Sequence, residues 1–192
     1  GRRNVSGAYK TVTEITCHAM GTHFLSPDIR TVIDIGGQDS KVIRISKYGY
    51  AETFYMNDKC AAGTGRFLEV MAQTMGIGIE ALGSAALTAK KAEPISSTCT
   101  VFAESEVISK IAEGKPREAI IAGIHQAIGE RLRGMVSAVG MHPPIALTGG
   151  VAKNQCMQSV LKNLLQTDIF IPEEPQIVGA LGAAIFAADS SL

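Results

Sequence analysis

The sequence predicts an α/β protein in which a mixed sheet packs against helices, and three observations lead to this prediction. Residues 31–56 hold short β-branched runs separated by turn residues. Residues 66–139 then repeat apolar side chains at helical spacing, and residues 145–188 alternate strand and helix patterns. Because no low-complexity segment, polar linker or internal repeat separates these parts, we expect them to share one sheet.

The first strands are expected to form two consecutive hairpins. Residues 31–35 are a β-branched run that ends in Gly36-Gly37, which is typical of a buried strand entering a tight turn. Residues 41–45 alternate apolar and polar side chains, and residues 51–56 follow a short glycine-containing turn. Antiparallel pairing of neighbouring strands is therefore predicted.

Four helices are expected in the middle of the chain. The first places Phe67, Met71 and Met75 on one face. The third ends at Gly114, a residue type that favours helix termination. The fourth begins at Pro116, which suits a first helical turn, and carries a branched apolar residue at every fourth position. The expected helices span residues 66–75, 79–87, 101–113 and 116–139.

The last part of the chain alternates strands with helices. Pro143-Pro144 ends the long helix, and the apolar run that follows it stops at a second glycine pair, Gly149-Gly150. The predicted elements are a strand at 145–148, a helix at 153–165, an edge strand at 169–172 and a helix at 176–188.

Composition excludes several classes of function. The 192 residues include 18 basic and 18 acidic side chains, so the balance of charge favours neither nucleic acid nor an acidic membrane surface as a partner. No apolar run is long enough to span a bilayer, and the start of the chain has no signal-peptide pattern. Four cysteines without short paired spacing argue against a secreted disulfide scaffold, so a reducing cytoplasm is expected.

The turn after the first strand has the residues of a phosphate site. Gly36 and Gly37 let backbone N–H groups approach a phosphate without a Cβ in the way. Asp34 is expected to hold a water bound to Mg²⁺, and Gln38 to orient an attacking water at the terminal phosphate. A plain hairpin turn, with aspartate as a turn former, is the alternative.

The second glycine pair repeats this design. Gly149 and Gly150 follow an apolar strand and precede a helix start that includes Lys153. The positive end of that helix can meet phosphate or ribose oxygens, and the missing side chains let a flat base lie on the backbone. A turn that serves packing alone is the alternative, but two such turns favour a nucleotide held between them.

Cys60 and Cys99 lie in similar settings. Each closes a small polar loop that precedes a predicted helix, where unpaired N–H groups and the helix dipole favour thiolate, the form that binds metal. Two such residues supply half of the four-cysteine cage of an iron–sulfur cluster, and a symmetric dimer would supply the other half.

Four segments in order resemble the activator ATPases of 2-hydroxyacyl-CoA dehydratases, a family that includes the ATPase subunits of benzoyl-CoA reductase. They are DIGGQD at 34–39, NDKCAAGTGRF at 57–67, STCTVFAESE at 97–106 and TGGVA at 148–152. The resemblance implies the acetate and sugar kinase/Hsp70/actin fold and a homodimer with one [4Fe–4S] cluster bound by Cys60 and Cys99 of both copies. It also assigns Gly36, Gly37 and Gln38 to the family's second phosphate motif, and Gly149 and Gly150 to its adenosine motif. Lys153, at the helix start after that glycine pair, is a further candidate for cofactor binding.

The resemblance further implies a mechanism and partners. ATP binding and hydrolysis, with Mg²⁺, would move the helices beside the cluster, and the dimer would pass one low-potential electron to an acyl-CoA dehydratase or reductase. Ferredoxin or flavodoxin would be the electron donor. The family's first phosphate loop is not found, so we expect residues 1–30 to be a connector from a missing first lobe and 31–192 to be the second lobe. Within it, the cluster-binding segment is expected at about 57–113 and the adenosine-binding segment at about 144–188.

Three alternatives stay open at this point. The first is that the chain is the ATPase subunit of a benzoyl-CoA-type reductase. The second is that it is a relative of sugar or acid kinases that does not use the cysteines. The third is that it is a fragment that dimerises without hydrolysing ATP.

Overall fold

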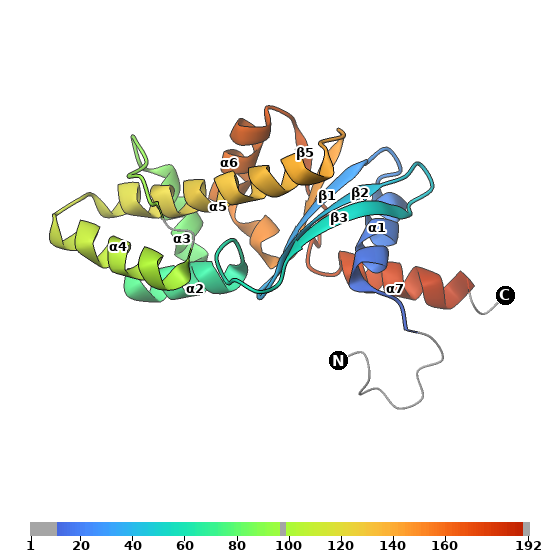
Figure 1. Cartoon of the computed structure of the whole chain (residues 1–192), viewed down its shortest axis with the longest axis horizontal. Coiled ribbons are helices and arrows are strands. Elements are labelled where there is room, and N and C mark those ends of the chain that lie inside the picture. Colours follow the sequence, from blue (N-terminus) through green and yellow to red (C-terminus); the bar gives the residue numbers. More distant parts are fainter. Residues whose placement is uncertain (1–10, 97–98, 190–192) are drawn as a thin grey trace.

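The computed structural model describes residues 11–96 and 99–189 (Figure 1). Its helices are α1 (Glu14–Leu25), α2 (Gly65–Thr74), α3 (Ile79–Leu87), α4 (Thr100–Ala112), α5 (Arg117–Val139), α6 (Gln155–Leu165) and α7 (Val178–Asp189), with a 3₁₀ turn, η1, at Gly150–Lys153. Its strands are β1 (Thr31–Ile35), β2 (Ser40–Ile45), β3 (Ala51–Asn57), β4 (Ile145–Thr148) and β5 (Ile169–Phe170).

The strands form one mixed sheet in the order β3-β2-β1-β4-β5. β1 pairs antiparallel with β2, and β2 with β3, which confirms the two predicted hairpins. β4 pairs parallel with β1 on one side and with β5 on the other. The β-branched and apolar runs fill the buried centre of the sheet, and β1 and β4 are buried at every position.

Helices cover both faces of the sheet. Alternate residues of β1 point to opposite faces: Val32 joins the cluster that includes Ile15 of α1, whereas Ile33 joins the cluster with α2, α3, α5 and α6. α7 packs along α1, and α2 to α4 extend to one side of the sheet with the first half of α5 (Figure 1). The fold therefore has a sheet between two helical layers and a helical extension.

The long helix α5 carries the apolar stripe that its sequence predicted. The residues at four-residue spacing are all buried against the sheet, α3 and α6: Ile120, Ile124, Ile128, Leu132 and Val136. The helices expected at 66–75, 79–87 and 101–113 lie within one residue of the observed α2, α3 and α4.

Several boundaries differ from the expectation. The helix predicted at 153–165 starts at Gln155, after the 3₁₀ turn η1, because the side chain of Asn154 accepts a hydrogen bond from the Met157 N–H and caps α6 there. β5 is shorter than the predicted 169–172, and α7 starts at Val178 rather than 176. The segment expected as a connector contains α1, a helix that the sequence pattern did not predict.

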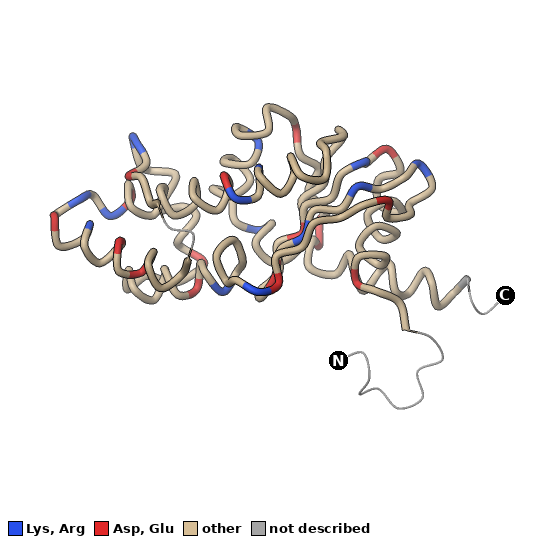
Figure 2. The backbone as a smooth tube through the Cα atoms, viewed as in Figure 1, with Lys and Arg blue, Asp and Glu red and all other residues tan. Residues whose placement is uncertain are grey.

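Charged side chains of both signs are mixed along the described part of the chain (Figure 2). Figure 2 shows lysine and arginine interspersed with aspartate and glutamate along the chain. Over residues 11–96 and 99–189, no single helix is long and apolar enough to cross a membrane; α2 and α3 satisfy that test only as a pair, bent by 82° between them.

Candidate functional site

The sheet topology brings the two glycine turns and the first cysteine loop to one edge. β1 and β4 are parallel, so the turns that follow them at Gly36 and Gly149 leave the sheet on the same side. Ser40 pairs with both Ile35 and Asn57, so the end of β3 lies at this edge too. Ligands of open α/β sheets bind at the carboxyl ends of parallel strands. This edge is therefore the candidate site.

A pocket of about 650 Å³ opens at this edge, a size that suits a small molecule or nucleotide. Both glycine turns, η1 and helices α2, α3 and α6 contribute to it. Its lining includes Gly36, Gly37, Gly65, Glu80, Gly83, Gly150, Lys153, Asn154, Gln155 and Gln176. Four of the predicted binding residues therefore lie together: Gly36, Gly37, Gly150 and Lys153. Gln38 is exposed on the turn beside Gly37, outside the lining, and Lys153 also forms an exposed ion pair with Glu174.

Gly149 shapes the second turn through its backbone. Its φ of +86° is one that residues with side chains rarely adopt, and a Cβ there would lie 2.3 Å from the carbonyl oxygen of Ile35. Gly149 N–H also donates to the carbonyl of Pro175, which ties the turn to the segment before α7. Only glycine allows β1 and η1 to approach this closely.

We expect Gly149→Ala to lower the free energy of unfolding by about 2 kcal/mol or more, since strain at positive φ adds to a backbone clash. Gly37→Ala is the matched control, because a Cβ at Gly37 meets no atom within 4 Å. Urea denaturation of both variants measures the difference. Equal losses would mean that the close approach at Gly149 does not hold the turn.

Asp34 lies in a buried charge cluster on the α1 side of the sheet. It is 2% exposed, and its Oδ1 accepts a hydrogen bond from the Thr148 hydroxyl at 2.9 Å. Its Oδ2 lies 3.2 Å from Lys41 Nζ, which also contacts Asp39 Oδ1 at 2.7 Å. His18 Nδ1 approaches Asp34 Oδ1 to 3.5 Å. Asp34 is outside the pocket lining, and a lysine ammonium balances its charge.

Lys41 is as buried as Asp34, yet it keeps its charge. Burial lowers the pKa of Lys41, but attraction to Asp34, Asp39 and the more distant Glu14 outweighs burial, so the net effect is a raised pKa. Aspartate oxygens are donors that Mg²⁺ prefers, but those of Asp34 and Asp39 that face Lys41 already neutralise its ammonium, so a contact between Asp34 and Mg²⁺ would run through water.

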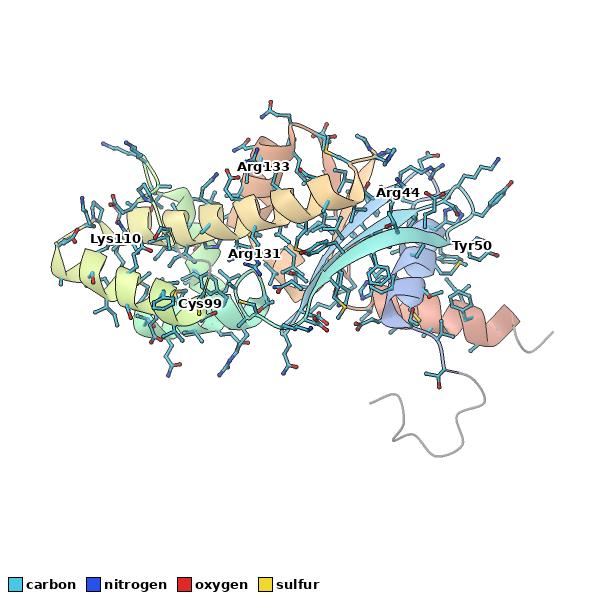
Figure 3. All side chains as sticks on the ribbon, viewed as in Figure 1. Arg44, Tyr50, Cys99, Lys110, Arg131 and Arg133 are labelled. Atoms are coloured by element: carbon cyan, nitrogen blue, oxygen red, sulfur yellow. The ribbon has the colours of Figure 1, made fainter. Side chains whose placement is uncertain are left out.

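Asn57 organises the loop that presents Cys60. Its side-chain amide donates to the carbonyls of Cys60 and Ala62, both at 2.9 Å. Its Oδ1 accepts from Arg131 of α5 at 3.3 Å, and Arg131 reaches down from α5 toward this loop (Figure 3). One buried asparagine therefore holds the cysteine loop to both the end of β3 and the long helix.

The loop is also tied to the phosphate turn. After Cys60 the chain enters α2, whose first N–H groups, of Gly65 and Arg66, donate to the carbonyls of Gly36 and Gly37, each at 2.8 Å. The Gly36-Gly37 turn thus borders the pocket on one side and anchors the helix after Cys60 on the other.

Cys99 lies directly before α4, at its N-cap position (Figure 3). α4 packs along α2, and Thr74 of α2 donates a hydrogen bond to Glu104 of α4. Cys60 and Cys99 are both partly exposed and outside any disulfide, whereas Cys17 and Cys156 are buried. Burial raises the pKa of the Cys156 thiol to about 11, which disfavours metal binding there.

Thiols are the ligands of iron–sulfur clusters, and one copy offers two that are partly exposed: Cys99 at the N-cap of α4, and Cys60 in the loop before α2 rather than at a helix start. Across the described part of the chain, no three histidine, cysteine, aspartate or glutamate side chains form a metal-binding group. One copy therefore does not supply a complete site from these residue types.

Four residues of this region were not predicted from the sequence: Lys41, Asn154, His125 and Arg131. Three of them act through partners distant in the chain, such as Asn57 for Arg131 and Asn154 for the buried His125. Lys41 instead pairs with Asp34 and Asp39 close by in the sequence. Only Lys41 had a signal in the sequence: it lies in a strand that is buried, and charged residues are rarely buried without a partner.

Comparison with known proteins agrees with this geometry. The chain is 46% identical over 191 residues to the 2-hydroxyisocaproyl-CoA dehydratase activator of Clostridioides difficile, covering 100% of this chain and 72% of that protein. It is 48% identical over 191 residues to the activator of lactoyl-CoA dehydratase of Anaerotignum propionicum, covering 100% and 74%. A solved structure of the Clostridium difficile activator, with bound ADPNP, superposes with a TM-score of 0.94 at 46% identity, over 99% of this chain and 71% of that one.

The architecture is the acetate and sugar kinase/Hsp70/actin fold that the resemblance implied. The sequence model that describes the BadF/BadG/BcrA/BcrD ATPase family matches residues 1–187 of this chain. Together with the identity to the dehydratase activators, this match shows that the chain belongs to the BadF/BadG/BcrA/BcrD ATPase family.

Proposed function

We propose that the protein is an ATP-dependent activator that delivers single electrons to an acyl-CoA dehydratase. Two copies would share one [4Fe–4S] cluster, with Cys60 and Cys99 of each copy as the four ligands. The cluster supplies one-electron transfer at low potential when bound. The similarity of this chain to activators of 2-hydroxyacyl-CoA dehydratases supports a dehydratase as the partner protein. Ferredoxin or flavodoxin is the proposed electron donor.

The observation that carries this proposal is the shared turn between pocket and cysteine loop. Gly36 and Gly37 line the pocket with their backbone and accept hydrogen bonds from the first residues of α2. A nucleotide phosphate that moves this turn also moves the start of α2 and, with it, the loop of Cys60. ATP would then favour the arrangement of the cysteine loops that docks on the partner, to the extent that it binds that arrangement more tightly.

The site residues predicted from the sequence would share nucleotide binding, some from the pocket lining and some from behind it. The Gly36-Gly37 turn would hold a phosphate oxygen through the Gly37 N–H, since the Gly36 N–H donates to the carbonyl of Asp39, and Gly149 and Gly150 would let adenosine lie on the backbone. Lys153 would contribute positive charge at the same wall. Asp34 would orient water around Mg²⁺, with Lys41 holding its carboxylate in place.

Gln38→Ala is expected to slow ATP hydrolysis roughly 100-fold, because the amide is proposed to orient the attacking water. The dissociation constant for ATP should change by no more than about threefold, since Gln38 lies outside the pocket lining. Steady-state hydrolysis and equilibrium binding are measured on the same preparation. Gln73→Ala, an exposed glutamine on α2, is the control. Equal losses in binding and hydrolysis would remove the role in water positioning.

A further inference from the structure

A directed chain of hydrogen bonds joins α5 to α6 through two side chains. His125 of α5 is fully buried, and its Nδ1 lies 2.8 Å from the carbonyl oxygen of Ile121, one turn earlier. Its Nε2 lies 3.0 Å from the side-chain nitrogen of Asn154. The side-chain oxygen of Asn154 accepts the N–H of Met157 at 3.0 Å and caps α6.

One arrangement of protons satisfies all three contacts. The Ile121 carbonyl can only accept, so the histidine proton lies on Nδ1, and the Met157 N–H can only donate, so Asn154 presents its oxygen to α6. The Asn154 amide nitrogen then donates to an unprotonated Nε2. The other neutral tautomer would set two donors against each other at Nε2 and leave Nδ1 facing an acceptor.

Surrounding groups support this arrangement. Burial lowers the pKa of His125, which the hydrogen bond to the Ile121 carbonyl only partly opposes, and the N–H that Asn154 donates to Nε2 favours the neutral ring. On the opposite side, α3 approaches Asn154 at Gly83, where a Cβ would lie 2.7 Å from the Asn154 side-chain oxygen. The amide is therefore held between α3 and α5 with no space to turn freely.

Asn154 and Gly83 both line the 650 Å³ pocket, next to Lys153 and Gln155. We infer that His125 is a positioning residue for the nucleotide site: it fixes the Asn154 amide, and the amide fixes the start of α6 and the end of η1 as one wall of the pocket. This inference rests on the proposed function, in which the pocket takes an adenine nucleotide.

Two conservative variants separate the two ring nitrogens. The side-chain amide of His125→Gln reaches the position of Nε2 and can accept from Asn154, whereas that of His125→Asn reaches only the position of Nδ1 and can donate to Ile121. With ADP as the probe, His125→Gln should retain affinity within about twofold. His125→Asn should bind ADP about tenfold more weakly, the factor that loss of one buried hydrogen bond produces.

Coupling to Asn154 is tested in a double-mutant cycle. In an Asn154→Ala background, His125→Asn should cause no further loss of ADP affinity, because its effect passes through the amide. In the nucleotide-free protein, hydrogen exchange at the Met157 amide should be faster in His125→Asn than in His125→Gln. Equal ADP affinities for the two variants, or additive losses in the cycle, would overturn the inference.

Nitrogen-15 NMR of the ring gives a readout that needs no nucleotide. In the full chain we expect a proton on Nδ1 and a bare Nε2, the reverse of the tautomer that predominates for a free histidine side chain. A proton on Nε2 overturns the inference whether or not ADP binds. Failure of the wild-type chain to bind ADP, with the Nδ1–H tautomer present, would instead contradict the proposed function.

Discussion

Replacing either Cys60 or Cys99 with serine is expected to remove iron from the protein almost completely. In a symmetric dimer each substitution acts twice, so two of the four proposed thiolates are lost and a cubane cluster has too few ligands. After anaerobic reconstitution with ferrous iron and sulfide, we expect the wild type to hold about four irons per dimer and each variant to hold less than about one. Iron and acid-labile sulfide are assayed on the same samples.

Cys156→Ala is the matched control for this experiment. Its thiol is buried, its pKa is raised to about 11, and it lies within α6 rather than before a helix. Removing it should leave the iron content unchanged, although the small cavity costs some stability. Iron retained by either the Cys60 or the Cys99 variant would refute the ligand assignment, and iron lost from the Cys156 variant would show that the assay reports stability alone.

Lys41→Met should destabilise the fold by about 3 kcal/mol, since it leaves the buried carboxylate of Asp34 without its cationic partner. The double variant Lys41→Met/Asp34→Asn should recover part of that loss, because it removes the unpaired charge as well. Urea denaturation at pH 7 measures both. Lys91→Met, at an exposed position between α3 and α4, should change stability by less than about 0.5 kcal/mol.

The pH dependence of this loss follows from the raised pKa of Lys41. A group whose pKa is higher in the folded than in the unfolded state contributes its full stabilisation at pH values below the unfolded-state pKa, here 10.5. That contribution is lost as the pH rises through the folded-state pKa. The difference in free energy of unfolding between wild type and Lys41→Met should therefore be constant from pH 6 to 9 and shrink above about pH 10.5.

In the urea experiment at pH 7, a Lys41→Met/Asp34→Asn variant no more stable than Lys41→Met would contradict the pairing of Lys41 with Asp34.

Elements with a strong apolar period were predictable from the sequence, and α1 was not. α5 and the central strands bury large branched side chains at regular positions, such as Ile124 and Ile33. α1 instead buries small or polar residues where it meets α7: the backbone of Val178 lies against Gly21, and that of Cys17 against Gly182. Close packing of small residues produces little contrast between faces, so no helical period marks it.

In the candidate site, too, some features were predictable from the sequence and others were not. The glycine turns at Gly36 and Gly149 were predictable because backbone chemistry requires glycine after a strand that meets a ligand, and their pairing follows from parallel β1 and β4. The bonds that hold the site in place were not predictable. Arg131 reaches an asparagine 74 residues away and His125 one 29 residues away, and no local pattern encodes such contacts.

Anaerobic native mass spectrometry of the reconstituted protein tests the central claim most directly. Two 20.2 kDa chains that share a cluster should be detected as a dimer carrying the mass of one [4Fe–4S] unit. The Cys60→Ser and Cys99→Ser variants, which are expected to lose their iron, should lack that additional mass. A monomer that carries a complete cluster by itself, or a dimer that takes up no iron when both cysteines are intact, would contradict the account.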